Sequence, residues 1–225
     1  MKLADFAQRQ LRGKIPELEK ALEGHLTEHH RFMLRLLWKE LAQQEELIAE
    51  LDRKIEEHTR PFANEIERLD AVPGVDRRVA EVALAEVGSD VKPFPTHSHV
   101  ASWAGVCPGN EESAGKRRRG RITPGNRWLK RSLVQAAWAA SHTKHTYLAS
   151  QYRRLAGRRG RKRALVAVGH SMLVIFYHML KDRTTYKDLG GDFFDRLEPE
   201  RLTRYYVKRL EDLGHKVTLE SGVPA

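Results

Sequence analysis

The sequence predicts a mainly α-helical protein that consists of a long, coiled-coil-like helical arm and a compact helical domain. Leucine and isoleucine recur at heptad spacing over residues 34–55, which is typical of a helix that pairs along one face. Further segments, among them 127–141, place apolar residues at helical spacing, and glycine and proline separate these segments. We expect the arm to span residues 1–66, the domain 67–187 and a helical tail 188–225.

The predicted arm carries one apolar seam. Its positions are Leu34, Leu37, Leu41, Gln44, Ile48, Leu51 and Ile55. A seam of this kind can pack on its own domain or pair with the same helix of a second copy, and the sequence leaves both open. Gln44 is the one polar seam residue and would fix the register of a pair. We predict a homo-oligomer that forms through the arm.

Residues 69–84 have the outline of a helix-hairpin-helix element. An apolar helix end leads into a Pro-Gly-Val turn, and a second amphipathic helix follows. In such an element the backbone N–H groups at Gly74, together with Arg77 and Arg78, would contact a DNA phosphate. Asp76 departs from the pattern, because a second glycine is common there and its charge would repel a phosphate. The alternative is an ordinary turn between two packed helices.

The segment from Val106 to Asn126 is rich in glycine, proline and asparagine, which predicts a loop. The loop contains Ser113 and then a run of basic residues. Asn126 is expected to cap the N-terminus of a helix over 127–141. A helix N-terminus that follows an arginine-rich loop favours binding of a phosphodiester.

Positive charge is concentrated between Lys116 and Lys187, where nineteen Lys and Arg residues stand against one acid, Asp182. The rest of the chain has a net charge of −8, so the total is +10. Charge this concentrated repels itself unless a polyanion offsets it, and the usual polyanion is nucleic acid. Besides the hairpin residues, we predict nucleic-acid contacts from Lys116, Arg117, Arg118, Arg119, Arg121, Arg127, Lys130, Arg131, Arg153, Arg154, Arg158, Arg159, Arg161, Lys162 and Arg163.

Composition argues against several other classes of protein. The most apolar stretch, 164–180, has only 17 residues and contains two histidines, so we expect a buried helix and no membrane span. The single cysteine, Cys107, excludes an internal disulfide, and the N-terminus has no secretion signal, which together favour the cytoplasm. The acidic residues form no convincing two-metal nuclease set, so no metal site is predicted in this chain.

Ser113 has no chemical signature of its own. A serine in a loop most often only forms hydrogen bonds, and no Ser-His-Asp grouping can be read from the sequence. Spacing alone therefore does not identify Ser113 as a nucleophile.

A series of short motifs connects this loop to a known family. They are, in order, the Pro-Gly-Val turn, Leu-Ala-Glu-Val-Gly at 84–88, Phe94, Ala-Ser-Trp-Ala-Gly at 101–105, Pro108, Ser113, Gly115, the basic stretch, Gly125-Asn126 and Leu-Lys-Arg at 129–131. Because it has these motifs in this order, the chain resembles the C-terminal, serine-bearing domain of the insertion-sequence transposases named one-ten, one-sixteen and nine-oh-two. Two small departures are Ala114, where many members have glycine directly after the serine, and Pro124, where lysine is frequent.

The resemblance implies an RNA-guided DNA recombinase. A serine at the position of Ser113 attacks a DNA phosphodiester in this family and holds the cut strand as a phosphoserine. Full-length members begin with a RuvC-like domain whose acidic residues bind magnesium, and Met1 falls inside what should be the linker. We therefore expect DNA and a structured guide RNA as partners, magnesium in the missing domain, poor activity of the chain alone, and a location at the bacterial nucleoid.

Two alternatives remain open. The chain could be a non-catalytic module, a truncated relic or a regulator, that holds DNA or guide RNA and cannot cut. A weaker alternative is an unrelated helix-hairpin-helix DNA-repair protein, which would not need the Ser113 loop.

Overall fold

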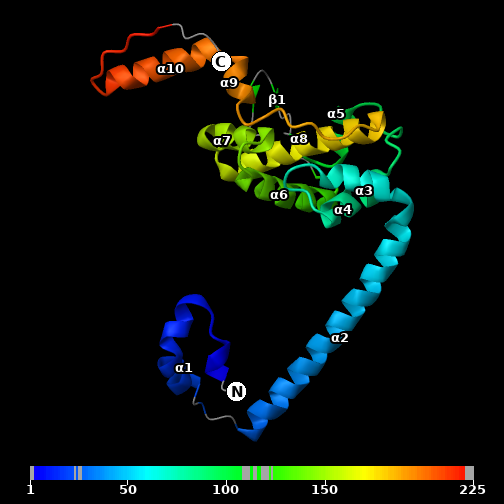
Figure 1. Cartoon of the computed structure of the whole chain (residues 1–225). Helices are drawn as coiled ribbons and strands as arrows, with labels where there is room; N and C mark the ends of the chain where they lie inside the picture. Colours follow the sequence, from blue (N-terminus) through cyan, green and yellow to red (C-terminus); the bar gives the residue numbers. More distant parts are fainter. Residues whose placement is uncertain are drawn as a thin grey trace. The chain divides into compact units, whose positions relative to one another are not determined.

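Helices account for almost all of the regular structure in the computed structural model, which describes residues 3–22, 24, 27–107, 112–113, 116–117, 122 and 124–220. The predicted mainly α class is confirmed, and the strands in those residues are two of two residues each. The chain divides into two compact units, residues 1–60 and 61–225 (Figure 1). The predicted tail, residues 188–225, falls inside the second unit.

The first unit begins with short helices and continues into one long helix. Its elements are η1 (Leu3–Phe6), η2 (Arg9–Lys14), α1 (Ile15–Leu22) and α2 (Glu28–Thr59). A reciprocal capping box starts α2: the Thr27 hydroxyl accepts from the His30 amide at 3.2 Å, and the His30 ring accepts from the Thr27 amide at 3.3 Å. The helix ends just before Pro61, which lies in η3 (Arg60–Phe62) and cannot continue a helical hydrogen-bond ladder.

The heptad seam lies along α2 and is exposed. Its leucines are between 51% and 62% exposed, with Leu41 at the lower and Leu51 at the upper value. Packing within the first unit therefore leaves the seam unburied. Pairing with a second copy of the chain stays a prediction.

The second unit is built from eight helices among the described residues and one short hairpin. They are α3 (Ala63–Asp70), α4 (Arg77–Val87), α5 (His97–Trp103), β1 (Glu112–Ser113), β2 (Lys116–Arg117), α6 (Arg127–His142), α7 (Tyr147–Arg159), α8 (Arg161–Asp182), α9 (Phe193–Leu197) and α10 (Pro199–Asp212). Helix α8 lies at the centre, where α5, α6 and α7 pack on it, while α4 packs on α6 and α3 on α4 (Figure 1).

The core forms around the apolar side of α8. Met172, Leu173 and Phe176 are almost fully buried there, and Leu133 of α6 packs into the same cluster. By length and composition α8 could cross a membrane, but half of its apolar window is buried inside the unit, as expected of a core helix. Gly169 of α8 faces Leu133 of α6, and a Cβ there would lie 3.4 Å from the Leu133 carbonyl oxygen, at ordinary contact distance.

The end of the described chain docks on α7 through aromatic side chains. Tyr147 stacks on Phe194 with ring centroids 5.4 Å apart and meets Phe193 edge-on at 5.2 Å. The Asp188 carboxylate accepts from the Tyr147 amide at 3.0 Å. These contacts hold α9 against α7 and so bring α10 close to the arginines of α7. After α10 the chain turns at Gly214, whose φ is +88°.

The exposed seam generates a prediction about assembly. Leu41→Asp would place a charge in the middle of a helix pair, so it should shift the protein from dimer or larger toward monomer. Light scattering at tens of micromolar protein measures this directly. Gln43→Asp, which adds the same charge off the seam, should leave the mass unchanged, whereas a monomeric parent chain would contradict the prediction.

Candidate nucleic-acid interface and serine-bearing loop

Ser113 lies in a short antiparallel hairpin. Strand β1 pairs with β2 so that Ser113 is opposite Lys116 and Glu112 is opposite Arg117. For these four residues the structure describes the backbone. The predicted contacts Arg118, Arg119 and Arg121 lie outside the described residues. The register therefore puts the serine position directly across from the first position of the basic run.

Both ends of the loop that carries this hairpin are fixed at one point. Gly125, at the end of the loop, packs directly on the backbone of Ala104 and Gly105, at its start. A Cβ on Gly125 would lie 2.5 Å from the carbonyl carbon of Ala104 and 2.6 Å from its oxygen, so only glycine fits. The backbone N–H of Asn126 also donates to the Trp103 carbonyl at 3.4 Å. We call this contact, residues 103–105 against 125–126, the loop joint.

Asn126 connects the loop joint to two helices. Its side-chain oxygen accepts from the amides of Trp128 and Leu129, both at 3.0 Å, which caps α6 as the sequence predicted. Its side-chain nitrogen donates to the carboxylate of Glu86 on α4. Both the oxygen and the nitrogen of the Asn126 side-chain amide are therefore hydrogen-bonded, and the group that accepts from the nitrogen is a carboxylate. The partner Glu86 was not predicted from the sequence, since it lies forty residues away.

The first turns of α6 present cations to solvent. Arg127 and Arg131 are one helical turn apart and exposed, and Lys130 is half-buried on the same side. The guanidinium of Arg127 lies over the Trp128 ring, 4.7 Å from its centroid, and the ring is 55% exposed. A phosphate at this helix start would meet both the helix dipole and these side chains.

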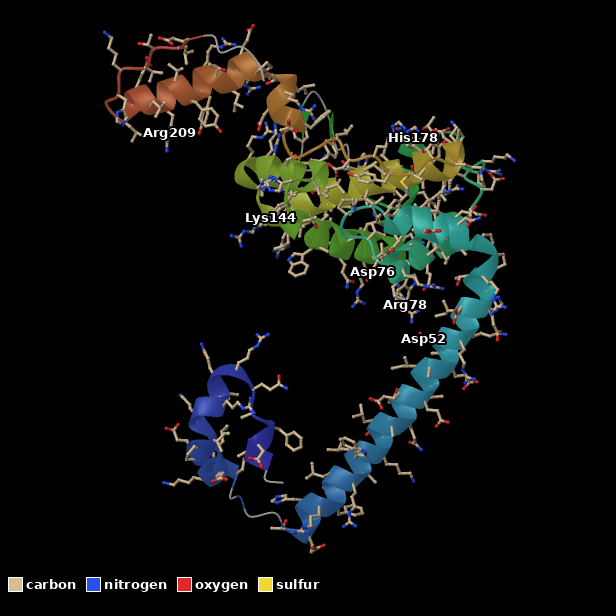
Figure 2. The ribbon with its side chains drawn as sticks, in the orientation of Figure 1. Asp52, Asp76, Arg78, Lys144, His178 and Arg209 are labelled. Atoms are coloured by element: carbon tan, nitrogen blue, oxygen red, sulfur yellow. The ribbon has the colours of Figure 1, made fainter. Side chains whose placement is uncertain are left out.

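The turn between α3 and α4 has a packing role. Gly74 has φ of +84° and approaches the α6 backbone so closely that a Cβ would lie 2.8 Å from the Ala140 Cα. Asp76 lies at the start of α4 (Figure 2). It caps this helix by accepting from the Val79 amide at 2.8 Å, a role that was not predicted from the sequence. A helix-hairpin-helix contact to phosphate at Gly74 stays a prediction.

Arg77 and Arg78 both bind one buried carboxylate. Arg77 Nε lies 2.9 Å from Glu81 Oε1, and an Arg78 terminal nitrogen lies 3.3 Å from Glu81 Oε2. Glu81 is 8% exposed, so its charge requires these partners. The side chains of the two arginines remain more than half exposed.

The second basic cluster forms at the corner between α7 and α8. Gly160, with φ of +83°, ends one helix and starts the other. The cluster consists of Arg153, Arg154, Arg158 and Arg159 on α7 and Arg161, Lys162 and Arg163 on α8. All seven side chains are exposed, and none has an ion pair with a described carboxylate. The structure therefore brings together the residues predicted for this cluster, with their charge not neutralised by described neighbours.

Comparison with known proteins bears on the segment that contains the loop joint. The sequence profile of the transposase IS116/IS110/IS902 family matches residues 66–153. This match spans Glu86, the loop, Asn126 and the start of α6. Residues 66–153 are a domain of the IS116/IS110/IS902 transposase family.

Two curated relatives support this assignment. The 43.6 kDa protein of insertion element IS110 from Streptomyces coelicolor is 34% identical over 121 residues, which are 53% of this chain and 29% of the relative. A protein named as a probable family 20 transposase from Pseudomonas aeruginosa is 31% identical over 159 residues, 69% of this chain and 46% of the relative. The chain thus spans less than half the length of either relative.

Tyrosines on α7 and α10 of the second unit differ in their exposure. Tyr147 is engaged with the α9 aromatics, and burial raises its pKa. The exposed tyrosines beside the arginines of α7 are Tyr205 and Tyr206 on α10. No sequence signal identified them, because tertiary docking of α9 brings them there.

A cavity of about 480 Å³ lies beside α8. Three histidines line it, His97, His170 and His178, together with Tyr186. Burial lowers the pKa of His170, and the neighbouring His97 lowers it further. Burial and the Asp188 carboxylate raise the pKa of Tyr186. Near neutral pH His170 and Tyr186 are therefore uncharged, and the cavity lining also includes Lys187.

The described residues do not fit a magnesium site. Among them, no three His, Cys, Asp or Glu side chains are clustered as a metal ion would need. We therefore assign no chemical step to a metal ion held by them.

The loop joint of the transposase domain predicts a sharp difference between two glycines. Gly125→Ala would force a methyl group into the backbone of Ala104 and Gly105, so the free energy of unfolding should fall by about 1–3 kcal/mol. Gly157→Ala, within α7 and with no atom near its Cβ, should raise it by about 0.5–1 kcal/mol. Urea unfolding followed by circular dichroism measures both. Equal urea midpoints for the parent and Gly125→Ala would contradict the claim that only glycine fits at the loop joint.

Proposed function

We propose that the chain binds DNA as the C-terminal part of an insertion-sequence transposase, and that Ser113 is the nucleophile that cuts and rejoins a strand. The observation that carries this proposal is the backbone position of Ser113. It lies opposite Lys116, in a hairpin whose loop is fixed at both ends beside the cationic start of α6. A nucleophile needs such a fixed position relative to the phosphate that it attacks.

The proposed step is a transesterification. The Ser113 hydroxyl oxygen forms a bond to the DNA phosphorus, and the bond from that phosphorus to one sugar oxygen breaks. The proton of the serine hydroxyl is lost, and the departing sugar oxygen gains a proton. The strand is then held as a phosphoserine, and attack by a sugar hydroxyl of another strand reverses the step and joins the strands. No net oxidation or hydrolysis takes place.

The cations of the domain would serve binding and charge stabilisation. Charge builds up on the phosphate oxygens as the serine attacks, and nearby donors lower the barrier more when they are fixed in advance. Arg127 and Arg131 at the start of α6 and the lysine position opposite Ser113 are candidates for this role. The cluster at the α7–α8 corner would hold more distant phosphates and contribute a strong salt dependence.

Guide RNA and magnesium enter as further proposals. The family resemblance implies both, and a magnesium ion would be held by a RuvC-like domain outside the described residues. We propose that this chain forms an active complex only with such a domain, and that its helical arm joins two copies. A module that binds DNA without cutting it is the outcome that remains if Ser113 has no chemical role.

A covalent adduct tests the proposed nucleophile. The chain is mixed with labelled DNA, magnesium, guide RNA and the RuvC-like domain of a full-length relative, and then denatured. We expect label to stay on the protein and to map, after proteolysis, to the peptide that contains Ser113. Ser113→Ala removes only the hydroxyl oxygen, so it should abolish the adduct while DNA affinity stays within about threefold of the parent.

Controls make each outcome informative. Ser102→Ala, at an exposed position near the loop joint, should retain the adduct. A full-length relative serves as the positive control. Adduct formation by Ser113→Ala, or mapping to another peptide, would remove Ser113 from the mechanism. If the relative forms an adduct and this chain does not, only the binding function remains.

A further inference from the structure

We propose that the groove between α7, α9 and α10 binds an unpaired stretch of nucleic acid, with bases on tyrosine rings and phosphates on arginines. The proposal rests on the proposed nucleic-acid function and deepens it, because it names a site and a strand state. Apart from Ser150 and Arg153, the residues that line the groove lie beyond residues 66–153, the segment matched by the family profile.

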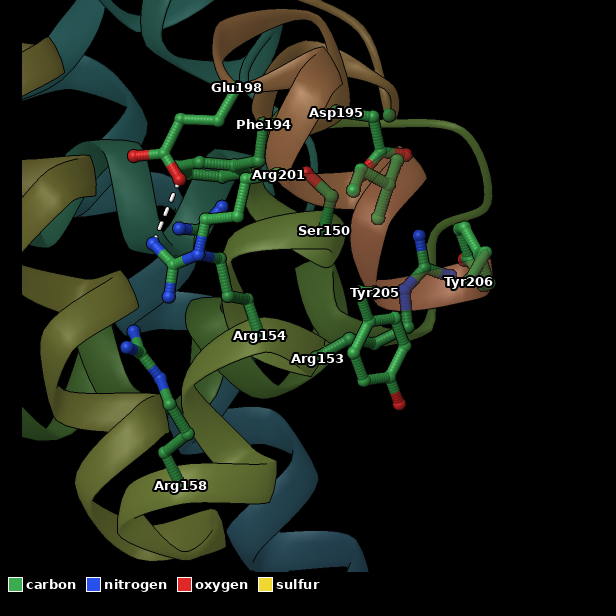
Figure 3. A pocket seen from close by; sticks show the side chains of 12 residues that line it. Ser150, Arg153, Arg154, Arg158, Phe194, Asp195, Glu198, Arg201, Tyr205 and Tyr206 are labelled. Atoms are coloured by element: carbon green, nitrogen blue, oxygen red, sulfur yellow. Dashed lines mark hydrogen bonds and ion pairs between the residues drawn. The ribbon is translucent and has the colours of Figure 1, made fainter. Parts of the chain in front are cut away.

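The groove is a defined cavity of about 720 Å³ within the second unit. That volume lies in the range of sites that enclose small ligands. Its lining comes from three helices and the turn before α9: Ser150, Arg153, Arg154, Arg158, Gly191, Phe194, Asp195, Glu198, Arg201, Leu202, Tyr205 and Tyr206. Figure 3 shows Arg154, Arg158 and Arg201 on one side of the opening and the two tyrosines on the other.

Positive charge exceeds negative charge in this groove. Four arginines line it against two acids, Asp195 and Glu198. Glu198 is paired with Arg201 at 2.8 Å. The three arginines of α7 have no ion pair with a described carboxylate. Arg158 lies in the last turn of α7, where the negative end of the helix dipole offsets part of its charge. Arg153 and Arg154 lie before the last turn, so their charge remains available to phosphates.

One arginine is already ordered for contact with a ligand. The guanidinium of Arg154 lies over the ring of Phe194, 5.1 Å from its centroid. This contact restricts the side chain, so less conformational entropy is lost when it binds a phosphate or stacks on a base. The Phe194 ring in turn is held by its stacking on Tyr147.

Two aromatic rings beside these arginines are exposed to solvent. Tyr205 is 60% exposed and Tyr206 57%, and their centroids are 5.5 Å apart with a nearly edge-on angle of 65°. In this edge-to-face contact one ring covers part of one face of the other, and the remaining ring surface is open to solvent. Exposed aromatic faces next to unpaired guanidinium groups are the combination by which proteins hold single strands.

The aromatic component selects unpaired nucleotides over a duplex. In double-stranded DNA the faces of the bases are covered by their neighbours, so a duplex could use only the arginines of the groove. An unpaired strand can use both arginines and tyrosines. Asp195 adds an acceptor within the groove for an amino group or a ribose hydroxyl.

Fluorescence anisotropy with three labelled probes tests the proposal on the full chain. The probes are a uridine 12-mer, a thymidine 12-mer and a 12-base-pair duplex. The double variant Tyr205→Leu with Tyr206→Leu keeps apolar bulk and removes the aromatic faces. We expect its affinity for at least one single strand to fall at least about fivefold, while its affinity for the duplex changes less than about twofold.

Two further variants complete the design. Arg154→Gln should weaken single-strand binding and reduce its salt slope by about 1. Trp138→Leu removes an equally exposed aromatic ring from α6 and should leave single-strand affinity within about twofold. Since both tyrosines are exposed, their double variant should unfold at the same urea concentration as the parent, which separates lost binding from lost folding.

The results distinguish the possible failures. Unchanged single-strand affinity in the tyrosine variant, or equal losses for strand and duplex, would overturn the groove proposal and leave the Ser113 proposal intact. If the parent binds none of the probes, the nucleic-acid function itself fails. A tyrosine-dependent preference for uridine would assign RNA to the groove, and one for thymidine would assign a DNA strand; both outcomes support an unpaired strand.

Discussion

The loop joint is the interaction on which the rest of the candidate site depends. Gly125 packs on the backbone of Ala104 and Gly105 at a distance that no side chain permits. Directly beside it, Asn126 caps α6 and donates to Glu86 on α4. One short segment thus closes the serine loop, starts a helix and ties that helix to its neighbour. Local sequence signals could specify each part, but only the fold brings them together.

A concentrated positive charge is held on this domain by its apolar core. The apolar sides of α6 and α8 pack into one core, and the cations are left on the outer surface, at the start of α6 and at the α7–α8 corner. Glu81 offsets the charge of Arg77 and Arg78 only, so most of the repulsion among the cations of residues 116–187 is not relieved by described acids. A surface arranged in this way favours a polyanion as its partner. This partner is the substrate class of the proposed transposase.

Much of the fold could be predicted from the sequence, because its signals are local. The cap at Asn126 follows from residue type and from the apolar spacing after it, and both were confirmed. Contacts between distant segments could not be predicted: Glu86 as the partner of Asn126, and the docking of α9 that brings Tyr205 and Tyr206 to α7. Asp76 was interpreted as a departure from a phosphate-binding turn, while it caps α4. The role of Ser113 came from family resemblance and stays a proposal.

Hydrogen exchange in a variant of the joint tests the central claim most directly. Glu86→Ala removes the partner of the Asn126 side chain without touching the loop. If the joint fixes the loop and the start of α6 as one unit, the amides of Val106, Trp128 and Leu129 should all exchange faster in the variant, while those in the middle of α8 keep their protection. Unchanged exchange at all three amides would contradict the account, because the contact with Glu86 would then support neither the loop nor the helix.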